Sequence, residues 1–452
     1  MGKRIHNTSA VRSAFTLIEL LIAMALTLIL VYAIAEFYAY VGNAVRDSRA
    51  MIELGGQLRS VGQQLQDDLD SLTLRPEPWI DPNASPGYFT IYEGPYSDSR
   101  PDSGTNDITT INTNQIPDVV NNNVTTLVGD GDDVIAMTIR AGDVPFQGRY
   151  NGGTQTSQFA EVVWFATFTD TNGDGDWDLG EPRLLCRRQL IIRPDLGVLG
   201  TYGTLSNAID FWDDNDVSAR ISYNSTSMQF QVVANSLADL SLRENRFGCA
   251  LQGNGTAINS TSWKEIDIKP SDVNSLNVYT LSGNAFGEDR VLSNVLAFDI
   301  RAFDPTAPIY EDSSSQTALT PGDPGFAALF GSGTPTRIGV GAWVDLYYNQ
   351  VLAAQGVAAG SRPSSSFSGS SGASIPFWDT WPLAYELPPY NTGTGLDGLD
   401  TDGVNGVDDA GERQTQPPYA APLRGVQVRI RVYEPQTRQA RQITVGTDFI
   451  PE

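Results

Sequence analysis

The sequence of 452 residues predicts an α+β fold, in which one long N-terminal helix precedes a mainly antiparallel β domain with long loops. Three observations predict this class. Residues 15–35 are almost wholly apolar, leucines then recur every three or four positions up to residue 72, and short apolar runs with strand-like alternation follow. We therefore expect the helix over residues 15–75, after a short polar segment at 1–14, and a β-rich domain outside the cytoplasm over 76–452.

The first half of the helix is predicted to cross a membrane. About 20 apolar residues suffice to span a bilayer as a helix, which residues 15–35 supply. The basic residues Lys3, Arg4 and Arg12 precede the span, so the N-terminus is expected in the cytoplasm and the bulk of the chain outside it. A cleaved signal peptide would need a small-residue site after the span, where no convincing one follows. A plain signal anchor is the other alternative, but it gives no reason for Glu19.

The second half, about residues 36–75, is predicted to be amphipathic. Its apolar stripe contains Leu54, Leu58, Val61, Leu65, Leu69 and Leu72. Charged residues fall on the opposite face, namely Arg59, Asp67, Asp68 and Asp70. Prolines 76 and 78 are expected to end the helix, because proline lacks the amide hydrogen that the helix needs.

Residues 14–24, AFTLIELLIAM, resemble the prepilin signature of type IV pilins and type II secretion pseudopilins. The resemblance implies that residues 1–14 are a prepilin leader, removed by a membrane prepilin peptidase. Cleavage would fall between Ala14 and Phe15, and the new amine of Phe15 would be N-methylated. The resemblance also assigns Glu19 to assembly, since the family pairs this acid with the amine of a neighbouring subunit.

Strand-like runs fill the rest of the chain. They cover 87–92, 134–140, 162–168, 184–192, 228–233, 291–303 and 338–348. The clearest lies in 426–433, where Val426, Val428, Ile430 and Val432 alternate with polar residues before a turn and a second strand at 442–445. Polar insertions are expected at about 95–130 and 353–420, with 353–374 as a flexible loop. One domain is the preferred interpretation, and two subdomains divided near residue 250 are the alternative.

Two of these runs extend the resemblance. Residues 291–305, VLSNVLAFDIRAFDP, and 423–435, LRGVQVRIRVYEP, are similar to late strands of the minor pseudopilin called the J component and of PilW-like minor pilins. The chain is about twice the usual length of the J component.

An acidic loop, DTNGDGDWDLGE at 170–181, fits the calcium-loop pattern D-x-[DN]-x-[DN]-G-x5-E in full. Calcium takes six to eight oxygen ligands from a tightly turned loop. The expected ligands are Asp170, Asn172, Asp174, Asp176 through its carbonyl, Asp178 and Glu181. The flanking runs are strands, so we expect an isolated structural Ca²⁺ loop; a solvated acidic turn is the alternative.

A second acidic loop, DTDGVNGVDDAGE at 400–412, resembles the first with one residue inserted. Its candidate ligands are Asp400, Asp402, Asn405, Asp409 and Glu412. The insertion puts the first two out of register with the last three.

Composition narrows the classes of function. The net charge of −24 should repel nucleic acid, so no nucleic-acid partner is expected. The only histidine, His6, lies in the leader, and no nucleophile or nucleotide motif occurs, so the chain is not predicted to be an enzyme. Cys186 and Cys249 are either a disulfide, if they lie outside the cytoplasm, or two buried thiols.

The sequence therefore favours a minor pseudopilin or minor pilin, a structural subunit at or near the tip of a type II secretion pseudopilus or type IV pilus. Its expected partners are the prepilin peptidase, other pseudopilins or minor pilins, and the inner membrane. The alternative is a membrane-anchored, calcium-dependent adhesin or binding module that uses a prepilin-type anchor.

Overall fold

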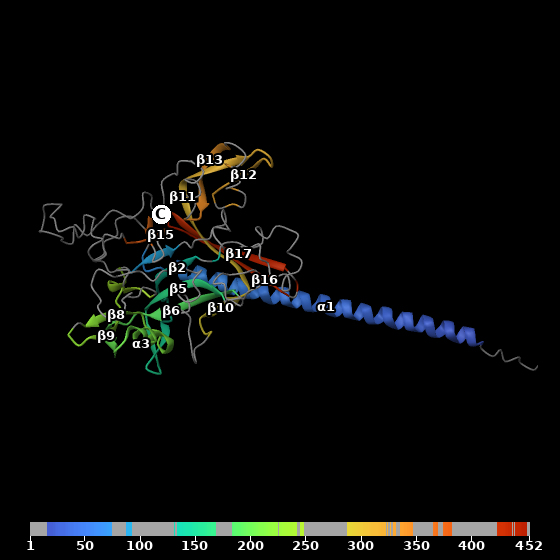
Figure 1. The fold of residues 1–452 in the computed structure, drawn as a ribbon, viewed down its shortest axis with the longest axis horizontal. Coiled ribbons are helices and arrows are strands. Elements are labelled where there is room, and N and C mark those ends of the chain that lie inside the picture. The colour runs from blue at the N-terminus through green and yellow to red at the C-terminus, as the bar shows by residue number, and fades with distance from the viewer. Residues whose placement is uncertain are drawn as a thin grey trace, which may run out of the picture. The chain divides into compact units, whose positions relative to one another are not determined.

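The computed structural model describes residues 16–74, 87–92, 131–168 without 132, 183–247 without 225 and 242–244, 287–346 with short gaps after 321, 365–368, 374–381, and 423–449 without 436 and 438. The chain divides into two compact units, Met1–Leu54 and Gly55–Glu452. Helix α1, Leu17–Asp70, runs from the first unit into the second (Figure 1). The predicted α+β class is confirmed, because this apolar N-terminal helix precedes mostly antiparallel sheet.

Within the second unit, α1 shows the predicted amphipathic face. Leu58, Val61, Leu65 and Leu69 are all buried. Asp68 is not on the solvent face as predicted, since it too is buried, and its carboxylate accepts a hydrogen bond of 2.8 Å from Trp164 Nε1. A partner that lies 96 positions away cannot be read from a local pattern.

The helix ends at Asp70, earlier than the predicted 75. Both the amide and the hydroxyl of Ser71 donate to the Asp67 carbonyl, which completes the last turn. The chain then joins the sheet, where Leu72 forms a bridge with Ile139 and the Thr73 amide donates to the Thr138 carbonyl. Sheet pairing, and not proline, therefore stops the helix.

A seven-stranded antiparallel sheet, here called the large sheet, lies beside this part of α1. Its strand order is β10-β6-β5-β2-β1-β15-β14. The strands are β1 Phe89–Tyr92, β2 Val134–Arg140, β5 Phe159–Phe168, β6 Arg183–Ile191, β10 Arg290–Ser293, β14 Ser365–Ser368 and β15 Ser374–Asp379. Strand β14 lies inside the predicted loop 353–374; backbone pairing with β15 forms it despite its serine-rich sequence.

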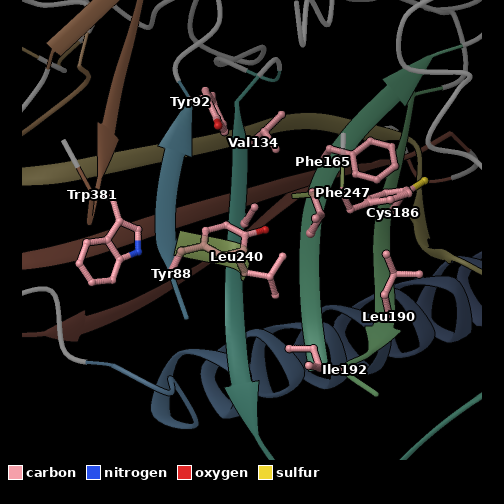
Figure 2. Close-up of a cluster of buried hydrophobic side chains, with 12 residues drawn as sticks. Tyr88, Tyr92, Val134, Phe165, Cys186, Leu190, Ile192, Leu240, Phe247 and Trp381 are labelled. Carbon is pink, nitrogen blue, oxygen red and sulfur yellow. The ribbon is translucent and has the colours of Figure 1, made fainter. Parts of the chain in front are cut away.

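Register assigns the residues of the large sheet to two faces. Trp164 pairs with Ile135 and Arg187, so these three share the face that receives Asp68 of α1. Phe165 and Val134 share the other face, which carries a core cluster with Tyr88, Leu240 and Trp381 (Figure 2). Both faces are covered, which explains why β2 and β5 are buried along nearly their whole length.

The second sheet has the order β12-β11-β16-β17, and β13 also pairs with β11. Its strands are β11 Val295–Asp312, β12 Thr317–Leu319, β13 Thr336–Val344, β16 Gly425–Glu434 and β17 Gln439–Asp448. The predicted C-terminal hairpin is confirmed: β16 pairs with β17, and Val426, Val428, Ile430 and Val432 are fully buried. Helix α1 packs here too, with Gly62 against Ile443 of β17.

A small accessory layer, which the sequence pattern largely missed, comes from two parts of the chain. The sheet β7-β9-β8 lies between β6 and β10 in the sequence, and the hairpin of β3 and β4 lies between β2 and β5. The bounds are β3 Phe146–Tyr150, β4 Gly153–Ser157, η3 Pro194–Leu196, β7 Val198–Tyr202, α3 Leu205–Ile209, α4 Phe211–Asp214, β8 Ala219–Asn224, β9 Gln229–Ala234 and η4 Asp239–Ser241. Only β9 matches a predicted run. Phe211, Val217, Phe230 and Val232 form its core.

Candidate functional site

The start of α1 brings together two residues of the predicted processing motif. Helix α1 begins at Leu17, so Thr16 is its N-cap and Glu19 its third residue. The amide and the hydroxyl of Thr16 donate to Glu19 Oε2 at 2.9 and 3.0 Å, and the Glu19 amide donates to Thr16 Oγ1 at 3.3 Å. These reciprocal bonds form a capping box, which satisfies amides that the first turn leaves without partners.

The capping box gives Glu19 a role inside its own chain, in addition to the assembly role that the resemblance implies. The signal was present, since Thr16 and Glu19 have the T-x-x-E spacing that precedes an apolar run. The negative carboxylate also lies in the first turn, where the helix dipole favours it. Within the described part of the helix, both hydrogen bonds that the Glu19 carboxylate accepts end on Oε2.

The helix that follows is open to its surroundings. From Leu17 to Val45 the side chains of α1 are exposed, including every leucine and isoleucine of the apolar run. In the described part of the chain, α1 is the helix that is long and apolar enough to span a membrane. Exposure of so much apolar surface is unfavourable in water, so lipid or other helices must cover it.

The cleavage site itself, Ala14 and Phe15, lies outside the described residues, so the predicted cut and N-methylation stay predictions. Both acidic loops lie outside them as well, with all their candidate ligands: Asp170, Asn172, Asp174, Asp176, Asp178, Glu181, Asp400, Asp402, Asn405, Asp409 and Glu412. Within the described ranges, no three acidic, histidine or cysteine side chains gather closely enough to hold a metal ion.

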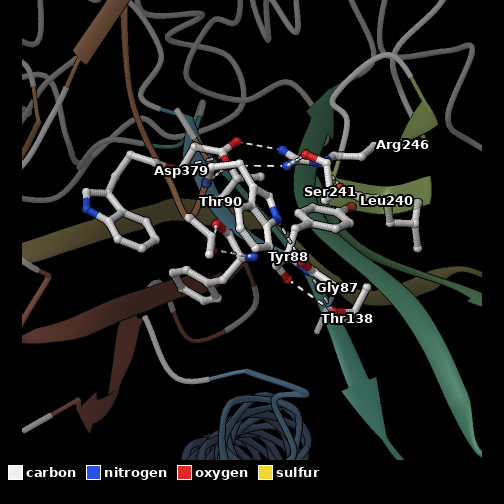
Figure 3. Close-up of polar contacts among 12 residues, drawn as sticks. Gly87, Tyr88, Thr90, Thr138, Leu240, Ser241, Arg246 and Asp379 are labelled. Carbon is white, nitrogen blue, oxygen red and sulfur yellow. Dashed lines mark hydrogen bonds and ion pairs between the residues drawn. The ribbon is translucent and has the colours of Figure 1, made fainter. Parts of the chain in front are cut away.

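A buried polar cluster was not predicted. Arg246 donates to both carboxylate oxygens of Asp379, at 2.5 and 3.2 Å, and its guanidinium lies 4.1 Å from the centre of the Tyr88 ring (Figure 3). Burial lowers the pKa of Arg246, but the charge and hydrogen bonds of Asp379 outweigh this effect and hold the pKa above its ordinary value. The pair joins β15 to the segment after η4.

Glu161 of β5 is the second buried carboxylate of this region. It accepts hydrogen bonds from Tyr88 Oη at 2.7 Å, Ser218 Oγ at 2.5 Å and the Phe247 amide at 2.9 Å. Burial raises its pKa, although these three donors oppose the shift. Both carboxylate oxygens are thus bonded inside the core, so Glu161 joins three segments and does not face a substrate surface.

Cys186 lies in the core cluster beside Phe165 (Figure 2), and burial raises the pKa of its thiol far above the ordinary value. Its candidate partner, Cys249, lies outside the described residues, so the disulfide stays a prediction. A deeply buried thiol is a poor nucleophile, since only the thiolate reacts readily.

Comparison with known proteins identifies the N-terminal segment. Residues 10–34 match the family model of the prokaryotic N-terminal methylation motif. The match contains Ala14, Phe15 and the capping pair Thr16 and Glu19. No curated protein and no solved structure matches the chain.

Proposed function

We propose that this chain is a minor subunit of a type II secretion pseudopilus or type IV pilus. The prepilin-type methylation motif supports this proposal, because it is the motif of type IV pilins and pseudopilins. The observation that carries the proposal is the capping box of Thr16 and Glu19 within the matched motif, at the start of an exposed apolar helix. The subunit would be assembled at or near the filament tip.

Processing would complete this arrangement. Cleavage after Ala14 would leave Phe15 as the first residue, with its amine next to Thr16. Glu19 Oε2 already accepts two hydrogen bonds from Thr16, which leaves Oε1 for the amine of a neighbouring subunit. A charge pair at this point offsets the cost of removing the carboxylate from water, and it would set the axial position of each helix in the filament.

The proposed location follows from charge and length. Lys3, Arg4 and Arg12 precede the apolar run, and cytoplasmic flanks of membrane spans are enriched in such residues. The N-terminus would therefore lie in the cytoplasm, α1 would cross the inner membrane, and the sheets would lie outside. Other pilin-like subunits would cover the exposed apolar face of α1 after extraction into the filament.

We also propose that the loop at 170–181 binds one structural Ca²⁺. The support is its complete match to the calcium-loop pattern, with hard oxygen donors at the required spacing. A bound ion would fix a loop that connects β5 to β6, two paired strands of the large sheet.

Intact-mass and N-terminal peptide mass spectrometry of the protein from its native membrane tests the main proposal. We expect a chain that begins at N-methylated Phe15. The matched control is Ala14→Leu, which puts a bulky residue at the cleavage site and should leave the leader attached. A wild-type chain that begins at Met1 or Gly2 would contradict the proposal and favour the membrane-anchored binding module.

A further inference from the structure

Four aromatic residues gather where the apolar part of α1 ends. Tyr32, Phe37, Tyr38 and Tyr40 lie within nine positions, and each exposes between 63% and 73% of its surface. The rings of Phe37 and Tyr38 contact each other edge to face, at 6.1 Å between centroids. Such a concentration of exposed rings on one helix requires a partner that accepts both aromatic surface and phenol hydroxyls.

The rings surround the helix and do not form a stripe. A helix turns about 100° per residue, so Phe37, Tyr38 and Tyr40 lie at about 140°, 240° and 80° from Tyr32. A neighbouring helix covers one side, and it would select a stripe at three- or four-residue spacing. A ring of aromatic side chains is instead typical of the membrane–water interface, where amphipathic rings lie at the level of the lipid headgroups.

The distance along the helix agrees with this interpretation. Nineteen apolar-run residues, Leu17 to Ala35, precede Glu36 at the girdle and rise about 1.5 Å each, which gives about 29 Å. The hydrocarbon core of a bilayer is about 30 Å thick. If the rings lie at one interface around Glu36, Thr16 lies about 30 Å away, at the opposite interface, and Glu19 lies about one turn inside it. The carboxylate therefore avoids the middle of the bilayer.

We propose that Tyr32, Phe37, Tyr38 and Tyr40 form an aromatic girdle. The girdle docks on the lipid headgroups at the extracytoplasmic face of the inner membrane and fixes the depth of α1. The girdle holds Thr16 and Glu19 at the cytoplasmic interface, where a membrane peptidase reaches the cleavage site. This inference rests on the membrane insertion and orientation in the proposed function. Its partner is phospholipid, and a neighbouring helix is the competing occupant.

Accessibility of introduced cysteines measures the depth. The full-length protein, with Cys249→Ser, is placed in phosphatidylethanolamine and phosphatidylglycerol vesicles at high lipid excess. Single variants Ala33→Cys, Ala35→Cys, Gly42→Cys and Ala44→Cys are treated with a membrane-impermeant maleimide; the native Cys186 is buried and should not react. We expect labelling at 42 and 44 to be at least about tenfold faster than at 33 and 35, because the interface lies between them.

The girdle is then changed in two ways. Phe37→Leu, Tyr38→Leu and Tyr40→Leu together keep the surface apolar but remove the interfacial preference, so the helix should slide inward and labelling at 42 should slow about tenfold. The matched triple change to Trp keeps that preference and should restore the wild-type pattern. An unchanged pattern in the triple Leu variant overturns the proposal, as does a wild-type boundary that appears only when the protein is crowded in the bilayer.

Two measurements distinguish failure of the girdle from failure of the proposed function: the N-terminal mass of the protein from native membranes, and the cysteine labelling in vesicles. If the chain begins at N-methylated Phe15 but the labelling pattern is unchanged in the triple Leu variant, the girdle alone is rejected. If the labelling pattern changes in the triple Leu variant but the chain from native membranes is unprocessed, the pilin-type assembly is rejected and the girdle is supported.

Discussion

Arg187 of β6 and Asp68 of α1 form a bidentate ion pair: Arg187 Nε and Nη2 donate to the two carboxylate oxygens of Asp68, both at 2.8 Å. Both side chains are nearly buried, at 10% and 6% exposed. Trp164 supplies a third hydrogen bond to the same carboxylate. This contact is directional, unlike the leucine packing around it, so it fixes the rotation of α1 on the large sheet.

We expect Asp68→Ala to lower the free energy of unfolding of the second unit by about 3–5 kcal/mol, because it leaves the buried charge of Arg187 without a partner. Urea unfolding of the full chain in detergent, followed by tryptophan fluorescence, measures this. The control is Asp70→Ala, two positions later and exposed, which should cost less than about 1 kcal/mol. Equal losses in the two variants would show that the ion pair contributes nothing specific.

Two glycines of α1 should respond oppositely to a larger side chain. A β-carbon on Gly62 would lie 2.5 Å from Ile443 Cδ1, whereas one on Gly56 would meet nothing within 4 Å. Gly62→Val should therefore destabilise the protein by about 1–3 kcal/mol through overpacking. Gly56→Ala should stabilise it by about 0.5–1 kcal/mol, because alanine favours helix. Thermal unfolding compares the stability of the two variants. A higher melting temperature for Gly62→Val would contradict the packing of α1 on β17.

The capping pair separates a folding role from an assembly role. Glu19→Gln keeps an acceptor oxygen for Thr16 but removes the charge, so α1 should still insert while incorporation into filaments falls at least about tenfold. Thr16→Ser keeps the cap and should assemble normally. Immunoblots of sheared filaments and of membranes give both quantities. Normal incorporation of Glu19→Gln would contradict the proposed pairing with a neighbour's amine.

Asp216 gives the accessory layer a pH dependence. Its carboxylate binds Arg149 Nε at 2.8 Å and Arg188 Nη1 at 2.9 Å. Burial raises the pKa of Asp216, but the hydrogen bonds and charges of the two arginines outweigh it and hold the pKa below its ordinary value of about 3.9. The unfolded chain then binds the proton more readily, so this contribution to stability is present above about pH 4 and is lost as the pH falls through the folded pKa.

We therefore expect the difference in unfolding free energy between wild type and Asp216→Asn to be largest at pH 5–7 and to shrink below about pH 4. Urea titrations at several pH values measure it. Asp143→Asn, at an exposed position, should show little difference throughout. If this difference in unfolding free energy grows below about pH 4, then Arg149 and Arg188 do not stabilise the charged carboxylate.

The proposed calcium loop contains a natural reporter, since Trp177 lies between Asp176 and Asp178. Terbium, which takes the hard oxygen ligands of calcium, should luminesce on excitation of this tryptophan, and Ca²⁺ but not Mg²⁺ should displace it at equal concentration. Asp174→Asn should weaken binding, and Trp177→Phe should remove the signal while Ca²⁺ still raises the melting temperature. Calcium stabilisation that survives Asp174→Asn would place the ion elsewhere.

The sequence predicted correctly those elements whose structure depends on residues close together in the chain. The alternation of Val426, Val428, Ile430 and Val432 follows from a strand with one covered face, and the spacing of Leu58, Val61, Leu65 and Leu69 follows from a helix on a sheet. The methylation motif was readable because its residues are consecutive.

What failed depended on partners far away in the sequence. Asp68 has the spacing of a solvated acid, and only Arg187, 119 residues later, makes its burial favourable. Arg246 and Asp379 are 133 residues apart and carry no common motif. Residues 365–368 have loop composition, yet β15 supplies backbone hydrogen bonds that do not depend on composition.

The place of β1 in the large sheet has a consequence for biogenesis. Strand β1 pairs on one side with β2 and on the other with β15, and Phe89 bonds to Thr380 across 291 positions of sequence. In the proposed orientation β1 is exported before β15, so one edge of β1 stays open while nearly 300 residues are translocated. Such high contact order slows folding, and open strand edges invite aggregation. Chaperones that shield open strand edges should therefore raise the yield of the folded protein.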